Sequence, residues 1–528
     1  MKKRNRVMRT LYDSMEYIDI GSDLKVRLLG FDLAGFKAFQ ELTYIPINPI
    51  TVLAGLNSRG KSSVIQALLL LKQTLLAEKR VGGRITLDWD GSFFQVNRIE
   101  EMIYNRNGHG TFSFGFLSYC KTDKQYPTTV LGIISSDLNQ FFVKTTFTFH
   151  YNMKLPDESG LRLEISFEVI DEAKNRLLTV KVTEVADSDN VRIEFYFDKE
   201  DEMDRVFPST QIQYSYFMPM WNSSIPKFDA SSQEFEVFRY SSVYHGLFHP
   251  ILKAIQTELV NNLKYVGPLR EEPQRSYINR RIRGDDIGAR GENAVLLLQR
   301  EWHETITFVK LPTTQSTDTG GLKVINWADL ESQEMALNEA INNCLRWLGM
   351  QQLRVEEEGS SSIQATFSTL STDDLWVTIA DVGFGVSQIL PVLTTGLLAD
   401  SDSILIFEQP EIHLHPRAQA RLAELLVCFA RTGKRVLIET HSDHLINRLR
   451  RIIAEDMTDE LSDKVSIAFV QHGEEGASVE ALRVNEEGLV ENWPDGFLAE
   501  TADDAEAIML AGMNKWEARQ QSDEAQAA

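Results

Sequence analysis

Alternation of apolar and polar residues predicts that the chain begins its folded part with β-strands followed by one buried helix. Residues 24–54 alternate with a period of two and predict two or three strands. The last of them, Ile50–Ala54, is apolar apart from one threonine, as is typical of a strand buried in a parallel sheet. An apolar helix is predicted directly afterwards, over Ser63–Leu75.

Later segments predict a second sheet and further helices. β-Branched and aromatic residues with polar turns between them predict an antiparallel sheet. Its strands are expected at residues 145–150, 162–170, 177–185 and 191–197. Helical spacing of apolar residues predicts helices over His249–Lys264 and Gln333–Leu348. Two more apolar runs predict buried strands that lead to Glu408 and to His441.

The loop between the first buried strand and its helix has the G-x-x-x-x-G-K-S pattern of a phosphate-binding loop. Its glycines let backbone N–H groups face a phosphate chain, and the helix N-terminus adds positive potential. A lysine in this pattern reaches the β- and γ-phosphates, and the serine after it supplies a hydroxyl to Mg²⁺. The predicted nucleotide-binding residues are Gly55, Asn57, Ser58, Arg59, Gly60, Lys61, Ser62 and Ser63.

Two aromatic residues before the loop, Phe36 and Phe39, have two interpretations. Either one can stack on an adenine ring, or both belong to the hydrophobic core, and the core is the favoured interpretation for each.

Three later stretches supply the other parts of an ATP site. Small residues, a serine and a glutamine (Gly383, Gly385, Ser387 and Gln388) open an apolar helix whose N-terminus can hold a phosphate. Glu408 ends a buried strand, which suits a Mg²⁺ ligand at the carboxyl edge of a parallel sheet. His441 follows another buried strand and can donate a hydrogen bond to the γ-phosphate or to the attacking water.

The charge of the chain limits which classes of binding partner are expected. The 528-residue chain has a net charge of −22, which argues against a general nucleic-acid coat protein. One basic stretch, Arg270–Arg290, predicts either a groove for phosphates or a solvated loop offset by neighbouring acids.

Three widely spaced cysteines predict reduced thiols in a cytoplasm. The basic start is followed by no apolar h-region, and no run of about 18 apolar residues predicts a membrane span.

With these motifs in view, the chain resembles the ABC-type ATPases of the SMC, RecF and OLD kind within the AAA family. A narrower resemblance, to stand-alone prokaryotic defence ATPases such as PtuA of the Septu and retron systems, covers roughly residues 30–500. It is carried by the phrases GFKAF, GLNSRGKSS, YVGPLR, DVGFGVSQILP, EQPEIHLHP and ETHSDHL. It implies an α/β fold: an ABC-type P-loop ATPase head with a mixed sheet, an antiparallel β lobe and a helical insertion.

The resemblance also implies roles for individual residues. Lys61 matches the P-loop lysine, Glu408 the Walker B acid, and His441 the switch histidine. Residues 382–388 match a divergent ABC signature, and Gln95 lies where many such ATPases carry a glutamine that links Mg²⁺ to the rest of the protein. The implied Mg²⁺ ligands are therefore Ser62, Glu408 and Gln95. The implied assembly is a head-to-tail homodimer with ATP between the P-loop of one subunit and the signature of the other, with a higher oligomer left open.

Two departures from the family pattern change the expectation. The Walker B strand of most relatives ends Asp-Glu, whereas this one ends Glu408-Gln409. Because glutamine orients water but cannot accept its proton, slow hydrolysis is predicted unless Glu411 or His441 substitutes. The signature also lacks Ser-Gly-Gly, which leaves open whether Ser387 or the Gly385 backbone meets the γ-phosphate.

No nuclease motif is expected in this chain, since it shows neither an HNH pattern nor the acidic cluster of a Toprim domain. The resemblance implies instead a scaffold and switch in an anti-phage complex. Its expected partners are a separate HNH nuclease subunit (PtuB-like), a reverse transcriptase with its RNA/DNA product, and nucleic acid along Arg270–Arg290. The alternative is a RecF- or SMC-like repair or recombination ATPase that binds DNA directly.

Four segments are predicted along the chain. Residues 1–110 form the first half of the ATPase domain, and residues 111–370 form an inserted β-rich and helical region. Residues 371–475 complete the ATPase domain, and residues 476–528 form a small extension with a flexible tail.

Overall fold

The computed structural model describes most of the chain between residues 24 and 494. The described residues are 24–56, 59–77, 87–106, 109–122, 139–152, 161–184, 190–197, 202–208, 212–215, 218–221, 247–282, 284–311, 330–359, 361–368, 375–456, 458, 460–474 and 476–494, with 507, 509–511 and 513.

A six-stranded sheet forms the centre of the ATPase part, in the order β12-β19-β20-β3-β21-β22. Its strands are β3 (Ile50–Ala54), β12 (Leu263–Val266), β19 (Ile404–Glu408), β20 (Arg435–Glu439), β21 (Val465–Gly473) and β22 (Gly476–Leu482). The first five are parallel, and β22 runs antiparallel to β21, so the sheet is mixed. The α/β fold class is therefore confirmed.

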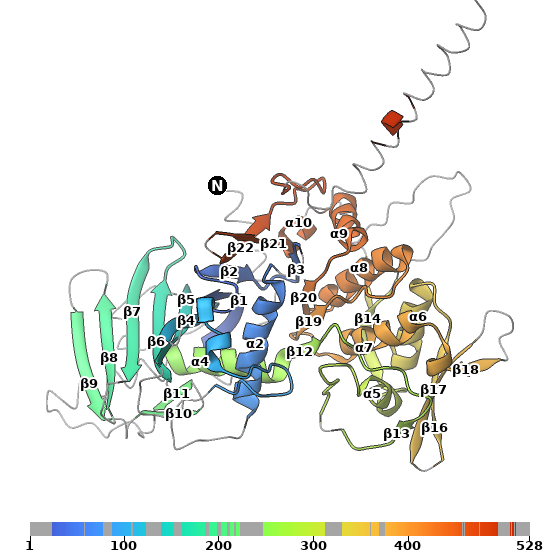
Figure 1. Cartoon of the computed structure of the whole chain (residues 1–528), viewed down its shortest axis with the longest axis horizontal. Helices are drawn as coiled ribbons and strands as arrows, with labels where there is room; N and C mark the ends of the chain where they lie inside the picture. Colours follow the sequence, from blue (N-terminus) through green and yellow to red (C-terminus); the bar gives the residue numbers. More distant parts are fainter. Residues whose placement is uncertain are drawn as a thin grey trace, which may run out of the picture.

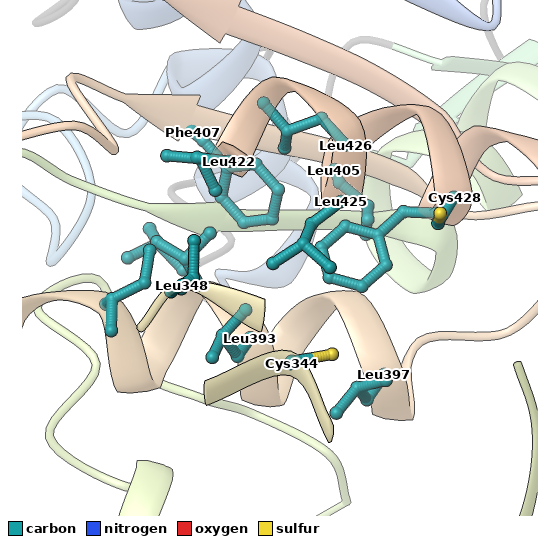
Figure 2. Close-up of a cluster of buried hydrophobic side chains, with 14 of the residues drawn as sticks. Cys344, Leu348, Leu393, Leu397, Leu405, Phe407, Leu422, Leu425, Leu426 and Cys428 are labelled. Carbon is teal, nitrogen blue, oxygen red and sulfur yellow. The ribbon is translucent and has the colours of Figure 1, made fainter. Parts of the chain in front are cut away.

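The two faces of this sheet are covered by different layers (Figure 1). Successive side chains of a strand point to opposite faces, so Ile404 and Ile406 join one core cluster whereas Leu405 and Phe407 join the other. Helix α2 (Lys61–Leu76) packs in the first cluster together with the β lobe. Figure 2 shows the second cluster, where leucines of α7 (Phe384–Leu398) and α8 (Pro416–Arg431) meet Leu405 and Phe407.

The β lobe is an eight-stranded antiparallel sheet in the order β2-β1-β4-β5-β6-β7-β8-β9. Its strands are β1 (Leu24–Ala34), β2 (Thr43–Pro46), β4 (His109–Thr122), β5 (Gln140–Asn152), β6 (Leu161–Ile170), β7 (Arg176–Glu184), β8 (Asn190–Phe197) and β9 (Glu202–Pro208). A hairpin, β10 (Ile212–Ser215) and β11 (Met218–Trp221), follows. The four strands predicted from alternation are β5 to β8, and their antiparallel pairing is confirmed.

Phe36 and Phe39 are both fully buried and belong to the core shared by α2 and the β lobe. Phe36 packs edge-on against Phe114 with ring centroids 5.2 Å apart. The core interpretation is confirmed, and stacking of either ring on an adenine is excluded in this arrangement.

The remaining elements lie beside α7 and α8 or connect the two parts. They are η1 (Ile99–Glu101), η2 (Tyr104–Arg106), α4 (His249–Thr257), η5 (Glu258–Asn262), β13 (Tyr277–Ile278), α5 (Ala294–Arg300), β14 (Thr305–Val309), β15 (Ser332–Ala336), α6 (Leu337–Trp347), β16 (Leu353–Glu358), β17 (Ser362–Ser368), β18 (Trp376–Thr378), η7 (Ile379–Asp381), α9 (Asp443–Glu455) and α10 (Glu460–Lys464). No helix in the described ranges is long and apolar enough to cross a membrane.

Two predicted helices differ from those observed. The helix predicted over His249–Lys264 is α-helical only to Thr257 and continues as the π-helix η5, because Leu263 and Lys264 pair with β19 as the start of β12. The helix predicted from Gln333 begins at Leu337, because residues 333–336 pair with β14. In both cases pairing with a distant strand overrides the local helical pattern.

Strand pairing links the four predicted segments closely. β12 lies in the predicted insertion but forms an edge of the central sheet, and β22 lies in the predicted extension but pairs with β21. The boundary at 110 falls within β4. The division into four segments stays a prediction about folding units.

Candidate nucleotide-binding site

Four segments meet at the carboxyl edge of the parallel strands. The P-loop follows β3, residues 267–270 follow β12, Gln409 follows β19, and residues 440–442 follow β20. Because β12, β19, β20 and β3 are neighbours in this order, their last residues come together although they are far apart in sequence. The sequence analysis placed the P-loop, Glu408 and His441 in one site, and the sheet brings these three segments together.

Backbone geometry shows why the P-loop needs its glycines. Gly55 has φ +136°, and a Cβ there would lie 2.3 Å from the carbonyl oxygen of Val470. Gly60 has φ +113° and directly precedes α2. Both values lie in a region that residues with side chains rarely adopt. Glycine is therefore required at both positions, just after β3 and just before the N-terminus of α2.

The P-loop lysine is held by the loop itself. Lys61 is 3% exposed, and its Nζ donates to the carbonyl oxygens of Gly55 at 3.0 Å and Leu56 at 2.7 Å. Burial lowers the pKa of Lys61, and the nearby Glu439 charge acts in the opposite direction. Its ammonium group lies within the curled loop.

The other predicted loop residues are placed as follows. Ser63 is buried, and its backbone N–H donates to the Gly60 carbonyl at 2.9 Å. The guanidinium of Arg59 reaches the carbonyl of His472 at 3.5 Å. Asn57 and Ser58 lie outside the described residues.

A pair of buried acids lies beside Ser62, of which only Glu408 is a site residue predicted from the sequence. Ser62 Oγ lies 3.2 and 3.1 Å from the two carboxylate oxygens of Glu439, the last residue of β20. Glu439 pairs in register with Glu408, the last residue of β19. Both apolar strands end in glutamate, so the sequence carries the same signal for Glu439 as for Glu408.

The two carboxyl groups share an environment that favours protonation. Burial, together with the nearby Glu439 charge, raises the pKa of Glu408 to about 7, while the hydrogen bond from the Tyr265 hydroxyl opposes the rise. Tyr265, on β12, donates to Glu408 Oε1 at 2.7 Å. Burial likewise raises the pKa of Glu439, with Lys61 and Ser62 opposing. A cation at this position would favour the ionised forms of both.

Arg270 fits neither interpretation of the basic stretch, which was expected to form either a groove for phosphates or a solvated loop. It is 4% exposed, and its Nη2 donates to the backbone carbonyls of Glu408 at 3.0 Å and Gln409 at 3.3 Å. A guanidinium enclosed beneath the Walker B turn cannot lie in an open groove for nucleic acid. Farther along the stretch, Arg275 pairs with the exposed Asp381 and Arg290 with Glu271, which agrees with the alternative of a loop offset by acids.

The residues after β19 and β20 are tied together. Gln409 has φ +45°, and its N–H donates to the Glu439 carbonyl at 2.7 Å. Glu411 Oε1 accepts from Thr440 Oγ1 at 2.7 Å and from the His441 N–H at 2.9 Å. Glu411, predicted as a substitute base, thus fixes the backbone that carries His441.

His441 is exposed and lies close enough to the P-loop for the charge of Lys61 to act on its ring. Desolvation lowers the pKa of His441, and the charge of Lys61 lowers it further. The ring is therefore neutral near pH 7 and can either donate or accept a hydrogen bond.

Two other predicted groups lie outside this cluster of contacts. Gln95 is exposed, and its amide donates to Asp90 Oδ1 at 2.7 Å within its own loop. Gly383 is exposed at the N-terminus of α7, with nothing within 4 Å of a Cβ placed there. Gly385 lies next to the His413 carbonyl, and Ser387 and Gln388 are buried. The roles of Gln95 and of the residues from Gly383 to Gln388 stay predictions.

The donor set fits a magnesium-bound nucleoside triphosphate. Gly55 and Gly60 have left-handed backbone conformations beside the ammonium group of Lys61, and Ser62, Glu408 and Glu439 place hard oxygen ligands nearby. Mg²⁺ usually binds one or two protein oxygens together with substrate phosphates. The described residues hold no larger cluster of His, Cys, Asp or Glu that could bind a metal by itself.

A family model described as "AAA domain, putative AbiEii toxin, Type IV TA system" matches residues 50–447, well over half of the chain. The chain belongs to this AAA domain family. As an AAA-family ATPase, it has the P-loop, the strand-end acids and the histidine within the matched span. A second model, described as a protein of unknown function (DUF3696), matches residues 462–508.

Other comparisons add little to the AAA assignment. No curated protein matches the chain. Among solved structures it is similar to an Smc head bound to the C-terminal winged-helix domain of ScpA, at 11% identity over 87% of this chain and 98% of that chain, with a TM-score of 0.37. It is also similar to an SMC head domain from Thermotoga maritima, at 9% identity over 87% of this chain and 100% of that chain, with a TM-score of 0.30. A third similar structure is an Smc head with an extended coiled coil, bound to the C-terminal domain of ScpA derived from Pyrococcus furiosus, at 10% identity over 92% of this chain and 100% of that chain, with a TM-score of 0.33. Similarities this weak support no argument about function.

Proposed function

We propose that the chain is an ATP-dependent dimerising switch that hydrolyses ATP slowly. The observation that carries this proposal is the site itself, in which Lys61, Ser62, Glu408 and Glu439 meet at one sheet edge while Gln409 occupies the position after the Walker B acid. The first four groups suit binding of a magnesium-bound triphosphate. Gln409 has an amide where most relatives have a carboxylate, so it can orient water without taking its proton.

The neighbouring acids, Glu411 and Glu439, are poorly placed to accept the proton of the attacking water. One oxygen of Glu411 already accepts two hydrogen bonds from residues 440 and 441. Both oxygens of Glu439 lie within hydrogen-bond distance of Ser62. These contacts support a structural role for both acids, which hold neighbouring residues of the site in place. With neither acid free to accept the water proton readily, activation of the water is expected to be slow.

The dimer is supported by the exposed N-terminus of α7. Gly383 is open to solvent, and the nearest atoms to a Cβ at Gly385 belong to His413 and Leu414, not to the P-loop. A helix N-terminus that is exposed and free of its own P-loop suits a phosphate presented by a second subunit. The Gly383–Gly385 backbone is the better candidate for this contact, since Ser387 is buried.

Hydrolysis is tested with Gln409→Glu, using Gln352→Glu as a matched control on the exposed residue before β16. Single-turnover rates with radiolabelled ATP should rise in Gln409→Glu and stay unchanged in the control. Light scattering should show an ATP-dependent dimer that lasts longer in the wild type. A wild-type rate of several per second that Gln409→Glu leaves unchanged or lowers would refute the slow-switch proposal.

For the cellular role, we propose a scaffold in an anti-phage complex that controls a separate HNH nuclease, with a reverse transcriptase and its RNA/DNA product as further partners. The motif resemblance described above is the support. Purification of the complex from its native operon tests it: recovery of a nuclease subunit would support the role. Tight, salt-sensitive DNA binding by the ATPase alone would instead favour a RecF- or SMC-like repair protein.

A further inference from the structure

Arg270 differs from the other arginines of the 270–290 stretch because it is enclosed and serves the ATP site. It comes four residues after β12 ends and is 4% exposed, whereas the side chains of Arg275 and Arg290 are 73% and 59% exposed. Its Nη2 donates to two consecutive backbone carbonyls, those of Glu408 and Gln409. A single guanidinium nitrogen therefore holds the carbonyls of the two consecutive peptide units on either side of the Gln409 Cα.

The backbone at Gln409 is in an unusual conformation. Gln409 has φ +45°, which residues with a Cβ rarely adopt and which costs energy unless neighbouring contacts hold it. Two contacts fix it: the Gln409 N–H donates to Glu439, and the Gln409 carbonyl accepts from Arg270. The direction of the Gln409 side chain depends on this backbone turn.

The positive charge of Arg270 also lies close to the acidic groups of the site. Burial lowers the pKa of Arg270 to about 10, and the nearby charges of Glu411, Tyr265 and Glu408 oppose that decrease. Arg270 Nε and Nη1 and Glu411 Oε2 are buried and have no hydrogen-bond partner among the described residues. Burying an arginine with two unpaired donors is unfavourable, so packing alone does not explain a guanidinium at this position.

We propose that Arg270 is a positioning residue for ATP hydrolysis: it holds the Glu408–Gln409 turn in its left-handed conformation so that both side chains face the nucleotide. It acts through the backbone carbonyls and places a positive charge behind Glu408 and Glu411. The inference rests on the proposed ATP hydrolysis at this site. It also gives the YVGPLR segment a role within its own subunit.

The kinetic test uses full-length Arg270→Lys and Arg270→Gln. Arg300→Lys is the matched control, because Arg300 also donates to a backbone carbonyl, that of Gly284 at 2.9 Å, but lies on α5 outside the site. Affinity and number of binding sites are measured with a fluorescent ATP analogue, and single-turnover hydrolysis is expressed per bound nucleotide. We expect turnover per site to fall about tenfold or more in both Arg270 variants, with affinity within about threefold, because small misplacements of reacting groups have effects of this size.

A purely structural role would lower the number of binding sites and leave turnover per site unchanged. Turnover within about twofold of wild type in both Arg270 variants would therefore overturn the proposal, as would a wild type that binds ATP without hydrolysing it. A wild type that fails to bind ATP would instead refute the proposed function.

A second measurement is independent of nucleotide. Glycine adopts φ +45° without strain, so Gln409→Gly removes the need for a clamp. In the nucleotide-free protein, Arg270→Lys should lower the melting temperature less in the Gln409→Gly background than in the wild type. Additive shifts would show that the two residues are uncoupled and would overturn the clamp.

Discussion

Replacing Glu408 by glutamine tests whether the acid pair is held partly protonated when no cation is bound. Burial raises the pKa of Glu408 to about 7 from an ordinary value of 4.5, which corresponds to about 3 kcal/mol of preference for the protonated form. The unfolded chain ionises this group near pH 4.5, so below that pH the raised pKa costs no stability. As pH rises toward 7, the folded state keeps a proton that the unfolded state has released, and stability is lost.

The expected result is a pH-dependent difference between variant and wild type. Glutamine keeps the oxygen that accepts from Tyr265 and carries no charge, so Glu408→Gln should match the wild type near pH 4.5 and be more stable by about 3 kcal/mol above pH 7. At an unfolding entropy of about 2 cal/mol/K per residue, this corresponds to about 3 °C in melting temperature for 528 residues unfolding together.

The assay is thermal unfolding followed by circular dichroism from pH 4.5 to 8, without nucleotide and with a chelator present. Glu356→Gln, on the exposed edge of β16, is the control and should leave the profile unchanged. Added Mg²⁺ and ATP should raise the wild-type melting temperature more than that of Glu408→Gln. A variant that is less stable than the wild type at pH 8, or equally stable at every pH, would refute the reasoning.

Two further predictions concern a buried ion pair and the P-loop. Arg435→Met should lower the free energy of unfolding by about 3 to 5 kcal/mol, because it leaves Glu258 buried without its partner at 2.6 Å. In denaturant unfolding, Lys464→Met, which breaks an exposed pair, should cost less than about 1 kcal/mol, and equal costs would contradict the argument. Gly55→Ala should abolish binding of a fluorescent ATP analogue, because its Cβ would lie 2.3 Å from the Val470 carbonyl. Retained binding at wild-type affinity would show that the loop adapts.

Local signals were sufficient to predict the first half of the site. The strand Ile50–Ala54, its glycine-rich loop and the helix that follows are contiguous, so their geometry depends mainly on neighbouring residues. Strand alternation likewise predicted β5 to β8, where each strand pairs with the next one along the chain. The fold class and the location of the nucleotide loop could therefore be predicted from the sequence.

The parts that could not be predicted depend on non-local pairing. Glu439 enters the site only because β20 pairs with both β19 and β3, which places its carboxylate beside Ser62. Arg270 looked like one of several surface arginines, because nothing in its neighbours shows that β12 will end beneath the Walker B turn. Leu263 and Lys264 left the predicted helix for the same reason.

The position of β12 at the edge of the central sheet explains why one short strand contributes so much to the site. β12 follows η5, and Lys72 of the P-loop helix donates to three carbonyls there, those of Leu259, Val260 and Leu263. Tyr265 within the strand contacts the side chain of Glu408, and Arg270 beyond the strand contacts its backbone. The P-loop helix and the Walker B turn are thus joined through one continuous segment as well as through the sheet. A displacement of α2 would be transmitted to Glu408 along this segment. Under the proposed function, this connection is a physical route from phosphate binding at Lys61 to the acids expected to hold Mg²⁺.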